Sequence, residues 1–234
     1  TERLKKGLMQ NLLTKGIGHK EFKETKLGKI PKNWQIRQIG EIAIEIYRYP
    51  TYYNIEYQKK GIPEIRGELI KENGSLENDL SKYRHISPTL SNRFSKTVLE
   101  EGDFVISVRG TMGKVAMVSR SLKGANITAN LMKISFNRNE CYPAFLKQIF
   151  LSKSFKNKLN NLSSNTTIKT IQVPILKSIK IKLPPISEQQ KIAEILSTVD
   201  KKIELQRKRK EKFERIKKSL MNDLLSGKKR VRIG

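Results

Sequence analysis

The segment ERLKKGLMQNLLT at residues 2–14 recurs as ERIKKSLMNDLLS at residues 214–226. Eight of the thirteen positions are identical, the other five pairs are chemically close, and residue 214 lies 212 residues after residue 2. Self-similarity at a long fixed offset is the sequence signature of a repeated unit. We therefore expect a protein built from repeats of this length, of which the chain holds the end of one helix, a globular domain and a complete second helix.

The later copy of the segment ends a long predicted helix. Pro184 and Pro185 terminate whatever precedes them, and Ser187 with Gln190 three residues later predicts a capping box. Ser226 and Gly227 end a helix predicted over residues 187–226, which is about 58 Å long at 1.5 Å per residue. Apolar residues recur along one face at spacings of three and four. They are Ile192, Ile195, Leu196, Val199, Ile203, Phe213, Ile216, Leu220 and Leu224.

Such a stripe is too long to be buried on a single domain of ordinary size. The related segment at residues 2–14 suggests that the partner is a repeat-related helix, packed antiparallel as a coiled coil. This partner is either a second repeat of the same chain or the same helix of a homodimer. The basic run from Gln206 to Lys210 is either a solvated face or a contact with DNA or another subunit.

The region between the helices predicts an α+β fold, with one mixed α/β globular domain before the long helix. Expected strands lie at residues 34–39, 104–109, 114–118, 131–136 and 179–183, and an expected helix runs from Pro143 to about Leu162. The predicted organisation has four parts. They are the end of a preceding helix and a linker (1–25), the globular domain (26–186), the long helix (187–226) and a basic tail (227–234).

The charge balance points to a polyanionic partner. The chain has 48 Lys and Arg against 22 Asp and Glu, a formal net charge of +26, while 37% hydrophobic residues suffice for a core. Because each neutralised phosphate releases condensed counterions, nucleic acid is the expected partner, with solubility alone as the alternative. A single Cys141 and the separated His19 and His85 predict no disulfide and no metal, and no run is long enough to span a membrane. We expect a cytoplasmic protein.

Catalytic motifs are missing from the sequence. The turn from Gly110 to Lys114 resembles a phosphate-binding loop, but Val108 stands where a Walker A motif needs its first glycine. A metal-dependent nuclease needs an Asp followed by Glu-x-Lys, and no such tripeptide follows the first aspartate, Asp79. No Asn-Pro-Pro-aromatic methyltransferase motif or nucleophile elbow occurs. We expect a protein that catalyses nothing by itself and needs no cofactor.

What remains is suited to binding DNA, because Arg and Lys pair with phosphate or guanine, Asn with adenine, and Ser or Thr with either. The alternatives are plain packing for the tyrosines, a structural hairpin for the Gly110 turn and a solvated connection for the loop at 163–169. The candidate DNA-binding residues are Tyr47, Arg48, Tyr49, Arg66, Arg109, Thr111, Lys114, Lys123, Asn126, Thr128, Asn130, Ser164, Asn165, Thr166, Thr167 and Lys169.

Four segments in order resemble the specificity (S) subunit of type I restriction-modification systems, in its second half. They are LGKIPKNW (27–34), GDFVIS (102–107), RGTMGKVA (109–116) and IKLPPISEQQKIAEIL (181–196). The last is similar to the junction between a target recognition domain and a conserved helix in that family, and it is the most specific of the four.

The resemblance implies a non-catalytic subunit with two recognition domains, each reading half of a split double-stranded DNA site in the major groove. Antiparallel helices would set the distance between the halves. Methyltransferase subunits would dock on the helices, and the translocating endonuclease subunit would join the complex. With one domain present, the chain is either part of a longer subunit or a half-length subunit that dimerises. Two other hypotheses stay open, a sequence-independent nucleic-acid-binding protein and a coiled-coil adaptor.

Overall fold

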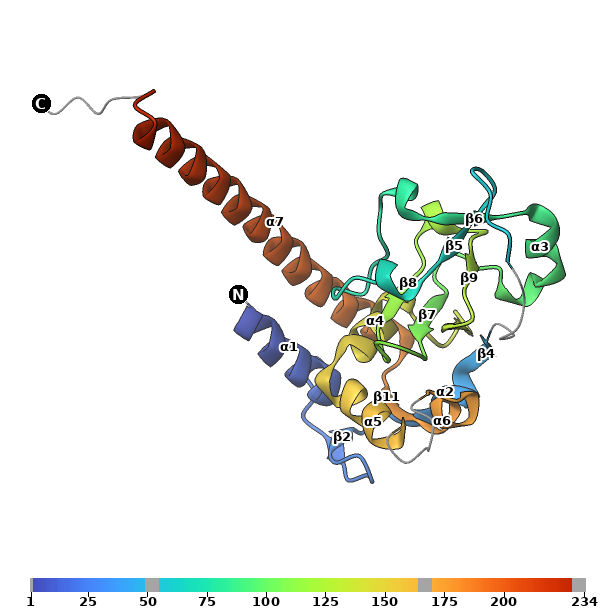
Figure 1. The fold of residues 1–234 in the computed structure, drawn as a ribbon. Helices are drawn as coiled ribbons and strands as arrows, with labels where there is room; N and C mark the ends of the chain where they lie inside the picture. Colours follow the sequence, from blue (N-terminus) through green and yellow to red (C-terminus); the bar gives the residue numbers. More distant parts are fainter. Residues whose placement is uncertain (1, 49–54, 164–169, 229–234) are drawn as a thin grey trace, which may run out of the picture.

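The computed structural model describes residues 2–48, 55–163 and 170–228 (Figure 1). Helix α1 (Glu2–Lys15) precedes a mixed α/β domain, and helix α7 (Ile186–Leu225) leaves it. Figure 1 shows α7 projecting away from the domain, with α1 alongside the first half of α7. The predicted α+β class with a long C-terminal helix is confirmed.

A four-stranded antiparallel sheet forms the centre of the domain. Its order is β4 (Ala43–Arg48), β10 (Leu131–Phe136), β7 (Phe104–Ser107) and β8 (Val115–Met117). Side chains alternate between the faces of a strand. Phe104 and Ile106 therefore enter one core while Val105 enters another, and all four residues of β7 are buried. Burial on both faces explains why the first three residues of β7, Phe104 to Ile106, are all apolar.

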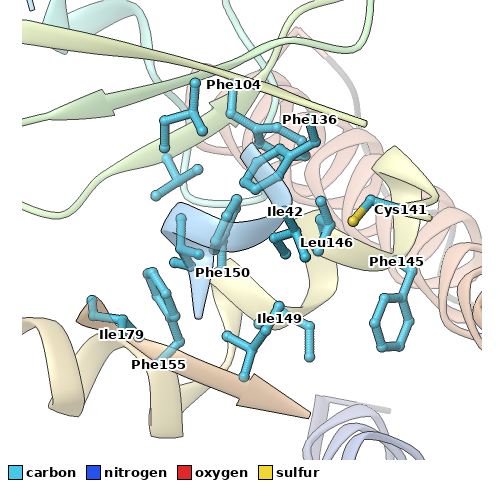
Figure 2. Close-up of a cluster of buried hydrophobic side chains, with 14 of the residues drawn as sticks. Ile42, Phe104, Phe136, Cys141, Phe145, Leu146, Ile149, Phe150, Phe155 and Ile179 are labelled. Carbon is cyan, nitrogen blue, oxygen red and sulfur yellow. The ribbon is translucent and has the colours of Figure 1, made fainter. Parts of the chain in front are cut away.

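The first core lies under four short helices and contains a cluster of phenylalanines (Figure 2). The ring of Phe104 packs edge-on against Phe150 at 5.0 Å and against Phe136 at 5.7 Å between centroids. Such edge-to-face contacts are the favoured geometry for aromatic pairs. The covering helices are α2 (Ile39–Ile42), α4 (Pro143–Leu151), α5 (Lys153–Ser163) and α6 (Val173–Ser178).

The second core lies beneath a small three-stranded sheet that the sequence did not predict. Its order is β6 (Arg84–Ile86), β5 (Ile62–Ile65) and β9 (Asn126–Ile127), with β5 parallel to β9. Helix α3 (Pro88–Arg93) lies next to it, and Ser87 caps this helix by accepting from the amide of Leu90. The remaining strands are β1 (Phe22–Lys23), β2 (Ile30–Pro31), β3 (Gln35–Gln38) and β11 (Lys180–Leu183).

Two predictions about helix ends are wrong. The helix expected from Pro143 to Leu162 is two helices, because Ser152 adopts an extended conformation between them and its hydroxyl caps α5 through the amide of Phe155. The capping box at Ser187 is not formed, because α7 begins one residue earlier. Pro185 occupies the N-cap position, and its carbonyl accepts from the amides of Glu188 and Gln189.

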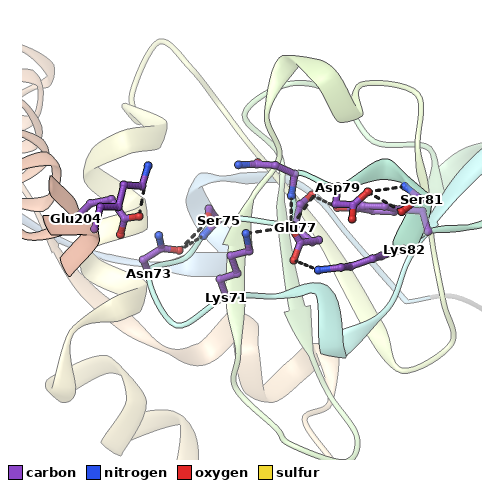
Figure 3. Close-up of polar contacts among 11 residues, drawn as sticks. Lys71, Asn73, Ser75, Glu77, Asp79, Ser81, Lys82 and Glu204 are labelled. Carbon is purple, nitrogen blue, oxygen red and sulfur yellow. Dashed lines mark hydrogen bonds and ion pairs between the residues drawn. The ribbon is translucent and has the colours of Figure 1, made fainter. Parts of the chain in front are cut away.

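A loop rich in polar contacts, residues 71–82, connects β5 to β6 (Figure 3). The carboxylate of Glu77 accepts from the amides of Asn78 and Asp79 and pairs with Lys71 and Lys82 at 3.2 and 3.1 Å. The amide of Asp79, followed by the two ammonium groups, lowers the pKa of Glu77 to about 2. The ionised carboxylate therefore organises the loop.

We expect this loop to loosen only in strong acid. Because the pKa of Glu77 falls from 4.5 to about 2 in the folded chain, its stabilisation is present above about pH 4.5 and is lost as the pH falls through 2. Glu77→Gln should speed amide exchange at Asn78 and Asp79 near neutral pH and abolish the acid dependence, as measured by NMR. Glu72→Gln, at a neighbouring exposed glutamate, is the matched control and should leave both unchanged.

Candidate nucleic-acid interface

Several of the predicted DNA-binding segments meet at one end of the central sheet. β4 ends at Arg48 opposite Met132, and β7 ends at Ser107 opposite Leu131. Because β10 is antiparallel to both strands, the ends of β4 and β7 and the start of β10 share this edge. Thr170 also lies here, since its hydroxyl donates to the carbonyl of Val108 at 3.0 Å. We call this end of the sheet the cationic edge.

A tight hairpin from Ser107 to Lys114 carries three of the predicted residues at the cationic edge. The Ser107 hydroxyl donates to the carbonyl of Thr111 at 2.6 Å and accepts from the amide of Lys114 at 2.9 Å. Gly110 and Gly113 have positive φ angles of 71° and 77°, which favours glycine at both positions. The structural hairpin and the presentation of cations are thus compatible, because Arg109 and Thr111 are exposed on this scaffold and Lys114 is half-buried.

Arg48 and Arg109 form a like-charged pair at the cationic edge. Nε and Nη2 of Arg48 are buried and have no hydrogen-bond partner among the described residues. Burial lowers the pKa of the Arg48 guanidinium, and the positive charge of Arg109 lowers it further. A guanidinium in this state gains most from an anion, because a buried charge is costly until it is paired. A phosphate or a base acceptor would supply that pairing.

The segment after β9 also contributes to the cationic edge, beside the end of β4 and the hairpin after β7. The amide of Thr128 donates to the carbonyl of Ile65 at 3.1 Å, and the carbonyl of Asn130 accepts from the amide of Val108 at 2.9 Å. Thr128 is half-buried and Asn130 is exposed. The structure therefore brings Thr128 and Asn130 to the edge that also carries Arg48 and Arg109.

Some predicted side chains are engaged within the protein. The prediction that Asn126 binds DNA is wrong, because this side chain is fully buried and its amide group contacts Ser91 and the backbone of Ile127, which leaves no access for a base. The guanidinium of Arg66 donates to the carbonyl of Lys82 at 2.9 Å and pairs with Glu68 at 2.6 Å. Arg66 is thus tied to its own domain.

Two further predicted residues have partners that lie on the surface. The ammonium of Lys123 pairs with Glu100 at 3.0 Å, and both side chains are exposed, so this contact is weak. The ring of Tyr47 carries Lys96 at 5.8 Å, a cation–π contact that the sequence pattern did not reveal because the two residues lie far apart along the chain. Six predicted residues lie outside the described part of the chain. They are Tyr49, Ser164, Asn165, Thr166, Thr167 and Lys169.

The predicted apolar stripe of α7 is mostly buried in the first half of the helix and exposed in the second half. Ile192, Leu196 and Ile203 are buried against the domain and α1, and Val199 is half-buried. The others are exposed on the described chain. They are Ile195, Phe213, Ile216, Leu220 and Leu224.

Helix α1 runs antiparallel to the first half of α7. Lys5 pairs with Asp200 at 2.5 Å and Glu2 pairs with Arg207 at 2.6 Å, so positions increase along one helix as they decrease along the other. The Arg207 guanidinium, first by hydrogen bonding and then by its charge, lowers the pKa of Glu2. Both pairs fit one register of α1 on α7, and the more buried Lys5–Asp200 pair contributes more to it than the exposed Glu2–Arg207 pair.

Neither metal chemistry nor a membrane span has support in the described residues. Within 2–48, 55–163 and 170–228, no three His, Cys, Asp or Glu side chains are grouped so that they could hold a metal ion. In the same part of the chain, no helix is both long and apolar enough to cross a bilayer. The cationic edge is thus the site with the clearest chemistry.

The fold and the site define a class of protein: a small α+β domain with arginines gathered at one end of its sheet, carried on a long helical stem. The chain belongs to the type I restriction modification DNA specificity domain family, whose model matches residues 31–215. The resemblance inferred from the sequence motifs is thereby confirmed.

Two relatives from Methanocaldococcus jannaschii cover 97% of this chain. The type I restriction enzyme MjaVIII specificity subunit is 32% identical, and the putative MjaX specificity subunit is 33% identical. The HsdS subunit from Thermoanaerobacter tengcongensis shares the fold, with a TM-score of 0.62 at 17% identity over 95% of this chain and 50% of that chain. The matches take in 54% and 51% of the two archaeal relatives, so the chain spans about half their length.

Replacing Arg48 and Arg109 together with Met should weaken binding to duplex DNA. The substitution keeps apolar bulk and removes two charges, so the slope of log affinity against log salt should become shallower by about 2. Fluorescence anisotropy with a labelled duplex at several salt concentrations measures both quantities. Arg3→Met, which removes one exposed charge from α1, is the control, and equal slopes for the wild type and the double variant would remove these arginines from the interface.

Proposed function

We propose that this chain is a non-catalytic DNA-recognition unit of a type I restriction-modification complex and reads one half of a split site. The observation that carries the proposal is Arg48 beside Arg109, with its Nε and Nη2 buried and without a hydrogen-bond partner among the described residues, at the edge where the predicted DNA-binding segments converge. Membership of the specificity-domain family supports the same role. The partners are double-stranded DNA, methyltransferase subunits and the endonuclease subunit.

In this proposal, the cationic edge makes two kinds of contact with DNA, to phosphates and to base edges. Arg48, Arg109 and Lys114 bind phosphates and fix the position of the domain on the duplex. These phosphate contacts carry no sequence information. Polar side chains beside them, such as Asn130 and Thr128, face the base edges in the major groove, where each base pair presents a distinct pattern of donors and acceptors. Specificity in the assembled complex is then the product of two such readings.

We further propose that the exposed half of α7 packs on another copy of the same repeat. The argument starts from α1, whose Leu12 and Leu13 are 7% exposed where they pack on the chain. Their counterparts at the 212-residue offset are Leu224 and Leu225, which are 45% and 83% exposed. These leucines are thus buried in α1, which lies beside the first half of α7, and exposed at the end of α7, which has no such neighbour among the described residues.

The ion pairs give this packing a register. At the repeat offset, Glu2 corresponds to Glu214 and Lys5 to Lys217. The pairs of α1 with Arg207 and Asp200 therefore become Glu214 with Arg207 and Lys217 with Asp200 of another copy. Because α7 holds both members of each pair, two such helices are complementary when antiparallel, as a two-fold interface requires. The second copy is an earlier repeat of a longer chain or a separate subunit.

Replacing Leu220 and Leu224 with Lys should uncover the end of α7. Each buried leucine contributes roughly 1.5–3 kcal/mol, so amide protection of residues 213–225 in the assembled protein should fall by about 100-fold or more. Hydrogen exchange with mass spectrometry measures this, with Lys218→Ala as the control on the same helix. Equal protection in the double variant would contradict the helix pair, provided that the β10 peptides keep theirs.

The proposed function is tested by purifying the tagged protein from its native host. We expect to recover a methyltransferase subunit among the bound proteins. We also expect this association not to require DNA. Recovery of ribosomal or other unrelated proteins without a methyltransferase would overturn the proposal. It would then be replaced by a sequence-independent nucleic-acid-binding role or by an adaptor role of the long helix.

A further inference from the structure

Three segments of the chain meet at Glu188, in the first turn of α7. Its Oε1 accepts from the amide of Ile17 at 3.0 Å and lies 2.7 Å from Nε2 of His19. Its Oε2 accepts from the indole Nε1 of Trp34, a fully buried side chain, at 2.9 Å. One carboxylate thus holds the linker after α1, the entry to the domain and the start of α7 together.

The next residue, Gln189, ties α7 to a fourth segment. It is fully buried, and its Nε2 donates to the carbonyls of Glu140 at 2.8 Å and Pro184 at 2.9 Å. Its Oε1 accepts from the amide of Tyr142 at 2.9 Å, at the N-cap of α4. Both donors and the acceptor of this amide are used inside the protein. We call Glu188, Gln189 and these partners the joint.

The joint is closely packed on the side of the linker. Gly16 has a φ of 67°, and a Cβ added to it would collide with Oε1 of Glu188, with the ring of His19 and with the ring of Trp34. The space between the preceding helix and α7 is therefore filled by the contacts that fix their relative direction. A larger residue at position 16 could fit only if the joint opened.

A small rotation at the joint has a large effect at the far end of α7. The helix has 40 residues and is about 60 Å long. A tilt of about 3° at its base therefore moves its far end by about 3 Å, which is close to the 3.4 Å rise of one DNA base pair. The direction of the helix relative to the domain must consequently be held within a few degrees if two domains are to read sites at one fixed separation.

We propose that Glu188 and Gln189 are positioning residues that set the number of base pairs between the two half-sites. They contact no DNA in this proposal, and they act by holding the recognition domain at one angle to the helix pair. The inference rests on the proposed function, because only a pair of domains on paired helices has a spacing to set. A joint with fewer contacts would let the domains read several separations.

The experiment uses the intact modification complex in its host, where methylation sequencing of the genome reports both half-sites and the spacer between them. The test variants are Glu188→Gln, which turns an acceptor into a donor facing the joint, and Gly16→Ala, which wedges it while keeping Glu188. Glu194→Gln changes an exposed carboxylate six residues further along α7 and is the matched control.

We expect the wild type and Glu194→Gln to methylate sites of a single spacer length. In both test variants, methylation at spacers one base pair longer or shorter should rise at least tenfold relative to that at the native spacer, with base preference in each half unchanged. A purely structural role would lower methylation at every spacer in the same proportion and would overturn the proposal.

If Glu188→Gln abolishes methylation altogether, His19→Ala decides, because it removes one contact of the carboxylate and leaves those of Ile17 and Trp34. A single unchanged spacer in His19→Ala and Gly16→Ala would then refute the role of the joint. A wild type that methylates no bipartite site would instead overturn the proposed function.

Discussion

The hydrogen bonds of the Glu188 carboxylate are the constraint on which the arrangement of the molecule depends. They join the end of α1, the entry to the domain at Trp34 and the first turn of α7, while Gln189 adds the start of α4. Hydrogen bonds that involve an ionised group are stronger than neutral ones, and these lie in a half-buried setting where they are less screened. A charged side chain at this point gives direction to the helices that leave the domain.

The central sheet determines where the predicted DNA-binding side chains lie. The two cores cover both faces of its inner strands β7 and β10, whereas side chains at the strand ends, such as Arg109 and Asn130, are exposed. The end of β4, the hairpin after β7 and the start of β10 therefore gather at one end of the sheet, where Arg48 and Arg109 stand without an opposing carboxylate among the described residues. The sheet holds the hairpin between β7 and β8 in place, so a substitution at an exposed residue such as Arg109 or Thr111 need not disturb the cores.

The long helix contains charged residues in both of its halves that could pair with a second copy of the helix. Asp200 and Arg207 in its first half contact α1, and Glu214 and Lys217 in its second half repeat the α1 residues of those pairs. Charges of opposite sign at matched positions select register and orientation in helix pairs, while apolar side chains supply most of the free energy of association. The repeated segment thus gives α7 both halves of an antiparallel contact, and the proposed pairing of two recognition domains rests on it.

The sequence by itself determined the long helix, the strands at β7, β8 and β10, the repeat and the family, because each is written in local periodicity or in a contiguous motif. Only the tertiary structure decided that β5 pairs with β9, that Asn126 is buried and that Arg66 is already bound to Glu68. It also decided that Arg48 and Arg109 are neighbours and that Glu188 joins three segments. These depend on which distant residues the packed chain brings together, and no local pattern records that.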